Sequence, residues 1–580
     1  MMTEELKKEI TKAIKSLQKN CKCNFDIPEI ELEHPADTSH GDYSTNVAMK
    51  IGKLQGENPV KIAENIVSQL LAASYQPLGI EKVQVVAPGF INFYLSTEYL
   101  LAEAAQIMTQ KGKYGTSNIG KGKTVLIDYS HPNIAKPIGV HHLLTTLIGD
   151  SIKRTYKSIG YKTIADNFLG DWGTQFGKAI YAYKKWGKKD VVEKDPINEI
   201  LKLYVKFHEE SEKDPELDNF GREEFKELED GDKENRKLWE WMRAETIKEL
   251  GEIYKTLGIE FDYYNGEAFY EDKLKDVLSE LDKKGLLEAG NEGAKIVDLE
   301  KENLPVALVQ KGDGATLYLT RDLAAIKYRA KTYKPEKILY VVETKQELHL
   351  AQLFAIAKKT DILDKSEPIH VKFGTMKFPE GGMSTRKGKV VYLWKVLEEA
   401  KERALKIINE KNPKLKDKEK VAEIVGIGSV KYAVLSQNRL RDVTFTWDKM
   451  LSLDGNSAPY IMYTNARCLS ILRKSKTTVK GENLVKSFKG ENLVKEESDL
   501  LRKLYLFPEI VEKSAEDYMP SHISTYVYDL SQTFNTFYNK LPVLNADEKV
   551  GGLRLKLVFA TAQVLKNGMA LLGIDLPEEM

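Results

Sequence analysis

Hydrophobic positions recur at helical spacing along most of this chain and change to short apolar, β-branched runs at a few places. In the N-terminal part, we predict helices and strands over 1–18, 46–55, 59–73, 83–86 and 91–95. From about residue 401 to the end, the helical period continues almost unbroken. The pattern therefore predicts a chain that begins with mixed helices and strands and ends in an all-helical part.

Within 124–154 the spacing of hydrophobic residues changes from that of a strand to that of a helix. The apolar run 125–127 has the size of a buried parallel strand, and a helical period begins at Val140. Strand, turn and helix in this order predict a phosphate site, because the free N–H groups at a helix start bind anions. The pair His141-His142 at this point can donate to phosphate oxygens. A βα unit whose histidines are surface or cap residues is the alternative interpretation.

Between about 184 and 292 the chain is strongly charged and helical. We interpret these charge runs as solvated helix faces and assign no chemistry to the segment. The sheet is predicted to resume at 304–310, and two strand-to-helix transitions follow, within 311–329 and 337–359. Polar residues at such strand ends are where ligands bind in an open α/β sheet.

Composition limits the classes of protein to consider. At 580 residues the chain is expected to hold about three or four domains, and its 87 basic and 86 acidic residues nearly cancel. This balance neither supports nor excludes nucleic-acid binding, because local patches contact phosphates. No apolar run reaches the roughly 18 residues of a membrane helix, and the charged start is not a signal peptide.

The three cysteines, Cys21, Cys23 and Cys468, are expected to form neither a disulfide framework nor a four-ligand zinc site. We therefore expect a cytoplasmic protein without a protein-bound structural metal and without a membrane partner.

Two short motifs carry a resemblance to a known family. SHPNIAKP, residues 130–137, and the residues after it resemble the first ATP motif of class I aminoacyl-tRNA synthetases, in the form found in arginyl-tRNA synthetases. Where that family has His-x-Gly-His, this chain has Gly139-Val140-His141-His142. The run MSTRKG, residues 383–388, is similar to the family's second ATP motif, with Gly382 where a lysine commonly stands.

The resemblance covers nearly the whole chain and implies a multidomain α/β fold. HGDYSTNVAMK and VVAPGFINFYL resemble the family's N-terminal domain, and the ending LLGIDLPEEM resembles its DALR-type domain. The implied parts are an N-terminal α+β tRNA-elbow-recognition domain (1–110), a Rossmann-type HIGH-superfamily catalytic domain (120–400) with a helical insertion (184–292), and an all-α anticodon-binding domain (401–580).

The implied activity is that of an arginine–tRNA ligase, with L-arginine, ATP accompanied by Mg²⁺, and tRNA(Arg) as ligands, and we expect a monomer. ATP would convert arginine to arginyl-adenylate, and the arginyl group would then pass to the 3′ end of the tRNA. Two alternatives remain open. One is a tRNA-binding paralogue that lost catalysis through the altered first motif, and the other is a small-metabolite nucleotidyl transferase of the same superfamily.

The resemblance also implies site residues, carried over position by position. The catalytic candidates are His142, His141, Lys136, Arg386 and Lys387, with Lys136 substituting for the lysine missing at 382. The further ATP-binding candidates are Gly139, Met383, Ser384 and Thr385. The arginine-binding candidates are Asp128, Asn133, Tyr318, Asp322 and Gln346. The tRNA-binding candidates are Phe90, Asn92, Tyr460, Thr464 and Met580.

Chemistry supports two of these assignments independently. A guanidinium group requires a carboxylate and a flat or hydroxyl-bearing partner beside it. Tyr318 and Asp322 are four residues apart at a predicted helix start, so they share a face. For the anticodon, Tyr460 can stack on an unpaired base.

Overall fold

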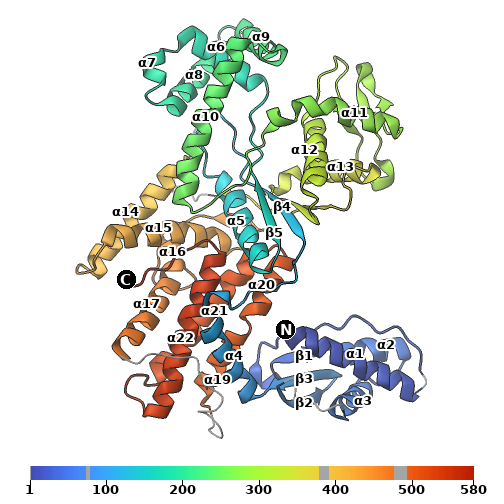
Figure 1. Cartoon of the computed structure of the whole chain (residues 1–580), viewed down its shortest axis with the longest axis vertical. Helices are drawn as coiled ribbons and strands as arrows, with labels where there is room; N and C mark the ends of the chain where they lie inside the picture. The colour runs from blue at the N-terminus through green and yellow to red at the C-terminus, as the bar shows by residue number, and fades with distance from the viewer. Residues whose placement is uncertain (1, 22, 73–78, 378–390, 476–492) are drawn as a thin grey trace. The chain divides into compact units, whose positions relative to one another are not determined.

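The structure is a computed structural model that describes residues 2–21, 23–72, 79–377, 391–475 and 493–580 (Figure 1). Contacts divide the chain into two compact units. The first comprises 1–115, 464–509 and 529–567, and the second comprises 116–463, 510–528 and 568–580.

The first unit contains a three-stranded antiparallel sheet in the order β1-β3-β2. Its N-terminal elements are α1 (Met2–Cys21), β1 (Tyr43–Thr45), α2 (Val47–Gln55), α3 (Pro59–Ala72), β2 (Ile80–Val86), β3 (Phe90–Leu95) and α4 (Thr97–Gln110). Leu6, Ile10 and Ile14 of α1 are fully buried, as the helical spacing of apolar residues requires. The helices and strands predicted for the first 95 residues are thereby confirmed, with ends shifted by a few residues.

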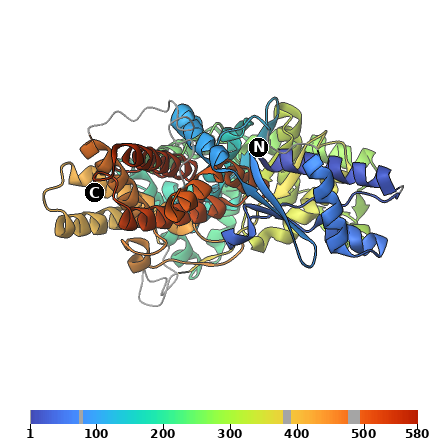
Figure 2. The same cartoon turned by 90° about the horizontal axis from the view of Figure 1, so that it is seen from below.

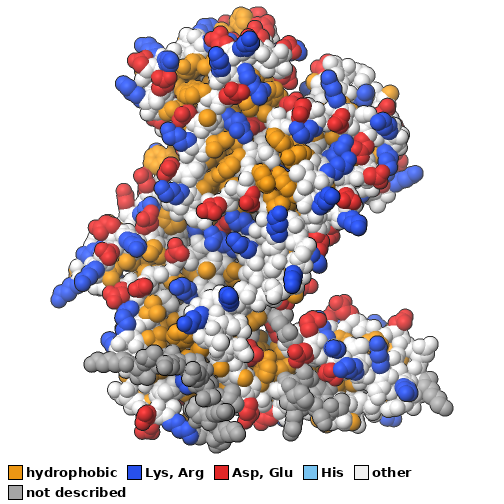
Figure 3. Space-filling view, viewed as in Figure 1, with side chains coloured by type: hydrophobic (Ala, Val, Ile, Leu, Met, Phe, Trp, Pro, Cys, Tyr) orange, Lys and Arg blue, Asp and Glu red, His pale blue; other side chains and the backbone are white. Residues whose placement is uncertain are grey.

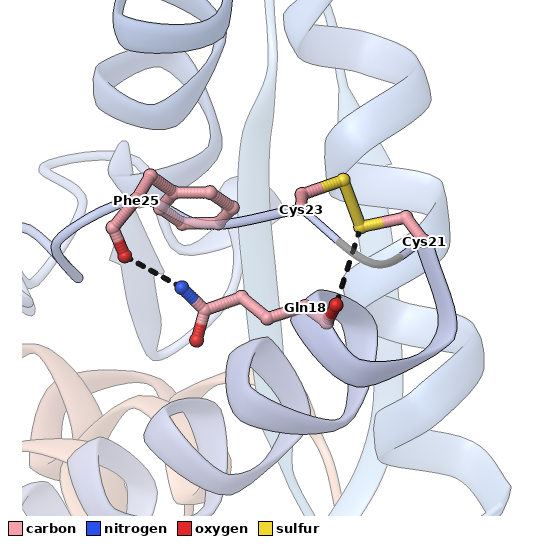
Figure 4. The surroundings of a disulfide bond; sticks show 4 residues. All are labelled: Gln18, Cys21, Cys23 and Phe25. Atoms are coloured by element: carbon pink, nitrogen blue, oxygen red, sulfur yellow. Dashed lines mark hydrogen bonds between the residues drawn. A yellow bond between two sulfur atoms is a disulfide. The ribbon is translucent and has the colours of Figure 1, made fainter.

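One bond in this unit was not predicted from the sequence. Cys21 and Cys23, at and just after the end of α1, form a disulfide (Figure 4). Two residues of separation place their Cα atoms 5.2 Å apart, within the range that a disulfide spans. Cysteine number and spacing suggested no framework, whereas a single local bridge needs only this proximity. Cys468 is buried and unpaired.

The second unit is built on a parallel four-stranded sheet in the order β10-β9-β4-β5. Its strands are β4 (Thr124–Asp128), β5 (Lys162–Asp166), β9 (Lys337–Tyr340) and β10 (Glu367–His370). Helix α5 (His142–Ser158) connects β4 to β5, and α12 (Tyr318–Tyr333) and α13 (Glu347–Lys359) flank β9 in sequence. Leu126 and Ile338 of the sheet share one core with Leu323 of α12. The predicted strand–turn–helix unit and the Rossmann-type sheet are confirmed.

A helical insertion interrupts this sheet, as predicted. It begins before the predicted residue 184 and contains α6 (Thr174–Trp186), α7 (Lys189–Val192), α8 (Pro196–Ser211), α9 (Glu216–Asp230), α10 (Lys233–Thr256) and α11 (Leu274–Lys283) (Figure 1). Basic and acidic side chains are interspersed over the visible face of this part of the chain (Figure 3). The charge runs are therefore solvated helix faces.

The strand expected to resume the parallel sheet at 304–310 belongs elsewhere. β8 (Ala307–Gln310) pairs antiparallel with β7 (Lys295–Val297), which pairs with β6 (Glu288–Ala289) in a separate sheet. Leu308 is 42% exposed while its neighbours Ala307 and Val309 are buried. Only one face of β8 is covered, which suits an antiparallel sheet rather than a parallel one.

The described part of the chain after residue 393 is mainly helical, as predicted from about residue 401 onward. Its principal helices are α14 (Leu393–Lys411), α15 (Lys418–Leu435), α17 (Ala458–Ser475), α19 (Lys495–Tyr505), α20 (Phe507–Glu516), α21 (Pro520–Lys540) and α22 (Glu548–Leu571). The two long helices α21 and α22 run side by side in both views (Figure 1, Figure 2). Among the residues that the structure describes, none of the helices has the length and apolar content needed to cross a membrane.

Candidate active site

The carboxyl ends of two neighbouring strands are joined by one buried arginine. Asp128 ends β4 and lies in register with Asp166 at the end of β5. Arg329 of α12 donates to both carboxylates, at 2.8 Å and 3.0 Å. All three side chains are buried, and breaking such a network costs about 3–5 kcal/mol. The network fixes α12 against the edge of the sheet where the first motif begins.

This network changes the interpretation of Asp128. Its other oxygen accepts from His131 Nε2 at 2.9 Å, so both oxygens are already engaged within the protein. Burial by itself raises the pKa of Asp128, but Arg329 and His131 overcome this effect and hold it below its usual range. The geometry favours an indirect role, in which Asp128 orients His131 and the loop. His131 was not among the sequence candidates.

The loop 130–137 is held in an unusual backbone conformation. Ser130, His131 and Ala135 have positive φ angles of 84°, 53° and 61°, which side-chain-bearing residues rarely adopt. The Ser130 hydroxyl bonds to Thr146 of α5 at 2.8 Å and to Tyr254 of α10 at 2.7 Å. Buried bonds to two helices keep the loop in this conformation, so it presents its side chains at fixed positions.

Asn133 and Lys136 project from this loop. Asn133 is exposed and forms a bridge with Gly170, where a Cβ atom would lie 2.2 Å from the Asn133 amide oxygen. Gly170 is therefore required for the close approach of the two segments. The ammonium of Lys136 lies 4.5 Å from the ring centroid of Tyr204, on helix α8 of the insertion. Burial lowers the pKa of Lys136.

The two histidines lie together at the start of α5. Their ring centroids are 4.0 Å apart. Burial and the neighbouring His141 lower the pKa of His142 to about 3, and burial lowers that of His141. Both imidazoles are therefore neutral at pH 7 and can donate a hydrogen bond, but they add no full positive charge to a phosphate site. The negative charge of a phosphate bound there would have to be neutralised by other residues.

Residues that follow the second motif in the sequence contact the first motif. The Val140 N–H donates to the Val391 carbonyl at 2.8 Å, and the Leu393 N–H donates to the Ile138 carbonyl at 3.0 Å. Gly139 forms a bridge with Tyr392 in the same contact. The residues of the second motif itself, Met383, Ser384, Thr385, Arg386 and Lys387, lie outside the described residues.

Three arginine-site candidates come from α12 and the start of α13. Tyr318 is the first residue of α12 and is 68% exposed, and Asp322 lies one turn further along. The Asp322 carboxylate accepts from His349 Nε2 at 2.6 Å, and this bond raises the pKa of His349. Gln346, immediately before α13, is exposed. His349 was missed in the sequence, where one histidine within a helical period carries no distinguishing signal.

A buried carboxyl, that of Glu267, is influenced by the charge of Asp322. Glu267 is 8% exposed, and one of its oxygens has no hydrogen-bond partner among the residues that the structure describes. Burial raises the pKa of Glu267 to about 8; Arg321 opposes this effect, while Asp322 and Asp171 add to it. Arg321 is itself paired with Glu271 at 2.6 Å. A buried, underpaired carboxyl beside an acid is a candidate cation site.

Glu267 lies within 184–292, to which the sequence analysis assigned no chemistry. No motif marks this residue, because its importance depends on burial and on a neighbour 55 positions away in the sequence.

The tRNA-binding candidates of the first unit are mostly internal. Asn92 is 3% exposed, and its side-chain oxygen accepts from the Ser44 hydroxyl at 2.7 Å. Phe90 is half-buried at the start of β3. Thr464 is fully buried and accepts from the Asn535 amide at 3.1 Å. The side chains of Asn92 and Thr464 are therefore packed inside the protein and are not accessible to a base.

The candidates of the second unit are more accessible. Tyr460 is half-buried near the start of α17, with its ring centroid 5.6 Å from that of Tyr528. Tyr463, one turn further along, is 46% exposed. The Met580 carbonyl accepts from the Asn412 amide at 3.2 Å, which holds the end of the chain beside the α14–α15 connection.

Three family models match successive parts of the chain. The family model for the class I (R) tRNA synthetase catalytic domain matches residues 103–447, the arginyl tRNA synthetase N-terminal domain matches 4–95, and the DALR anticodon binding domain matches 461–580.

Individual relatives match over the whole chain. An arginine–tRNA ligase of Halothermothrix orenii is 43% identical over 562 residues, covering 96% of this chain and 97% of the relative. One of Fusobacterium nucleatum is 43% identical and covers 99% of each. The crystal structure of arginyl-tRNA synthetase from Plasmodium falciparum matches with a TM-score of 0.84 and 27% identity, covering 100% of this chain and 99% of that one. The chain therefore belongs to the arginyl-tRNA synthetase family of the class I tRNA synthetases.

Proposed function

We propose that this protein is an arginine–tRNA ligase. The observation that carries the proposal is the match of this chain to arginine–tRNA ligases over its full length, and Asp322 of α12 and the buried Glu267 are the carboxyls proposed for the substrate. A guanidinium group has five N–H donors and a permanent charge, and two carboxyls are complementary to both. The relatives do not support the alternative of a tRNA-binding paralogue that has lost catalysis.

The activation step follows from this arrangement. An oxygen of the arginine carboxylate attacks the α-phosphorus of ATP, the bond to the bridging oxygen breaks, and pyrophosphate leaves. His141 and His142 donate hydrogen bonds to the phosphates from the start of α5, with Gly139 leaving room for the nucleotide. Lys136 and, from the second motif, Arg386 and Lys387 supply positive charge. Mg²⁺ bound together with the nucleotide would supply further positive charge, since oxygen ligands are those that it prefers.

The transfer step completes the reaction. A terminal ribose hydroxyl of tRNA(Arg) attacks the carbonyl carbon of the adenylate, and AMP leaves. ATP–pyrophosphate exchange dependent on arginine, measured with and without tRNA, tests the proposal. Exchange with arginine but not with lysine or methionine is expected. Absence of exchange and of tRNA charging under both conditions would overturn it.

The proposal also assigns a role to each part of the chain, an oligomeric state and a cellular compartment. We assign tRNA-elbow recognition to 1–110, catalysis to 120–400 and anticodon recognition to 401–580, with a monomer in the cytoplasm as the active species. The 43% identity over the full length supports this division of labour.

Glu267 is expected to make arginine binding depend on pH. Its raised pKa, about 8, leaves it mostly protonated at pH 7, whereas a bound guanidinium cation favours the carboxylate. Arginine binding then releases a proton, so the KM for arginine should fall as the pH rises from about 6.5 to about 8, by up to about tenfold per unit. Glu267→Gln should raise this KM and remove its pH dependence.

The KM for ATP, measured at the same pH values, is the control for the Glu267 prediction. A Glu267→Gln enzyme whose arginine KM keeps its original pH profile would show that this carboxyl does not face the substrate.

For tRNA recognition, Tyr460→Ala is expected to raise the KM for tRNA roughly ten- to hundredfold, because one stacked base contributes ~1–3 kcal/mol. The KM values for ATP and arginine should stay nearly constant. Tyr463→Ala, on the same helix and more exposed, is the matched comparison. Loss of thermal stability in Tyr460→Ala with an unchanged tRNA KM would assign Tyr460 to the packing against Tyr528 instead.

A further inference from the structure

The Lys136 ammonium has an unusual environment for a half-buried cation. Its side chain is half-buried, and burial lowers its pKa, which means that desolvation opposes the charge. Among the residues that the structure describes, no carboxylate pairs with it; the contact that it makes is with the face of Tyr204, 4.5 Å from the ring centroid. At this distance the electron-rich face of the ring attracts the cation.

Tyr204 is itself held in place within the insertion. It lies on α8, and its ring meets the edge of the His208 ring one turn later, with centroids 4.6 Å apart. Burial, and then Lys178, lower the pKa of His208, so it is neutral at pH 7. The nearby carboxylate of Asp218 is paired with Lys178 at 2.6 Å. Tyr204 therefore offers Lys136 an aromatic face, and no carboxylate among the described residues forms an ion pair with this lysine.

We propose that Tyr204 is a positioning residue for the adenylation reaction, holding the Lys136 ammonium at the first motif through its ring. The inference rests on the proposed role of Lys136 at the phosphates. A carboxylate partner would neutralise the lysine and compete with the triphosphate for it, whereas an aromatic face stabilises the cation and leaves its charge available. Through this contact the helical insertion takes part in nucleotide activation.

The test compares Tyr204→Leu, Tyr204→Phe and Tyr204→Glu in arginine-dependent ATP–pyrophosphate exchange. Cation–π contacts of this kind correspond to about a three- to thirtyfold effect, so Tyr204→Leu should lower kcat/KM for ATP by that factor and leave the KM for arginine unchanged. Tyr204→Phe keeps the aromatic face and should retain most of the activity. Tyr204→Glu should be at least as impaired as Tyr204→Leu, because the new carboxylate pairs with the lysine. Tyr181→Leu removes another tyrosine of the insertion that carries a lysine over its ring and should match the original enzyme in ATP kinetics.

Combining the Tyr204 variants with Lys136→Ala tests the proposed role of Lys136 and the positioning role of Tyr204 separately. If Lys136→Ala alone has no effect, the proposed role of Lys136 fails. If Lys136→Ala is strongly impaired, Tyr204→Leu should add little to it, because the ring no longer has a cation to hold. Effects that multiply in the double variant, a Tyr204→Leu enzyme with normal ATP kinetics, or a Tyr204→Phe enzyme as impaired as Tyr204→Leu would each overturn the positioning role.

Discussion

Replacing Asp322 by asparagine is expected to abolish arginine activation and leave the fold intact. The change removes the charge opposite the guanidinium, a loss of about 2–5 kcal/mol, or roughly 30- to 5000-fold in kcat/KM for arginine. The asparagine oxygen can still accept the 2.6 Å hydrogen bond from His349, so the packing between α12 and α13 should persist. Arginine-dependent exchange and the thermal midpoint measure the two effects separately.

Asp361→Asn is a suitable control for the Asp322 variant. Asp361 is an exposed acid of the same unit whose partner is Lys284 at 2.6 Å, and exposed pairs contribute little. The control should keep its activity. Near-normal kcat/KM for arginine in Asp322→Asn would show that the guanidinium binds elsewhere.

Lys136→Ala is expected to lower the rate of adenylate formation by orders of magnitude. The two histidines of the first motif are neutral at pH 7, because burial lowers the pKa of both, so they cannot replace the lost charge. Gly382 stands where a lysine of the second motif commonly lies, so no lysine is available at that position either. Single-turnover formation of arginyl-adenylate measures the chemical step apart from product release.

A second substitution makes the Lys136 result specific. Introducing a lysine by Gly382→Lys in the Lys136→Ala background should restore part of the rate, because it returns a positive charge to the triphosphate site. A full loss of rate that Gly382→Lys does not relieve, together with an unchanged affinity for ATP, would assign Lys136 to the structure of the loop.

Local periodicity was enough to predict much of the secondary structure. The helices α2 and α3 and the strand β4 begin and end close to their predicted positions, because each is specified by apolar spacing and by neighbouring turn residues. The proposed phosphate site at the start of α5 was likewise predicted from local sequence, since strand, turn and helix are consecutive in the chain. These features depend on residues that are neighbours in sequence.

The sheet to which a strand belongs could not be predicted in the same way. The run 304–310 has the composition of a strand, but its assignment to an antiparallel sheet with β7 depends on pairing and on which of its faces is covered. The spacing of Cys21 and Cys23 permits a bridge without requiring one, and the backbone at the end of α1 decides it.

The amino-acid sequence by itself determined the order of helices and strands, the family of this chain and most of its candidate site residues. The tertiary structure alone decided that Asp128 is engaged by Arg329, 201 positions away, that Glu267 is a buried carboxyl influenced by the charge of Asp322, and that Lys136 meets Tyr204. The physical reason is that burial and electrostatic partners set the charge state and reach of a side chain, and these partners come from distant parts of the chain.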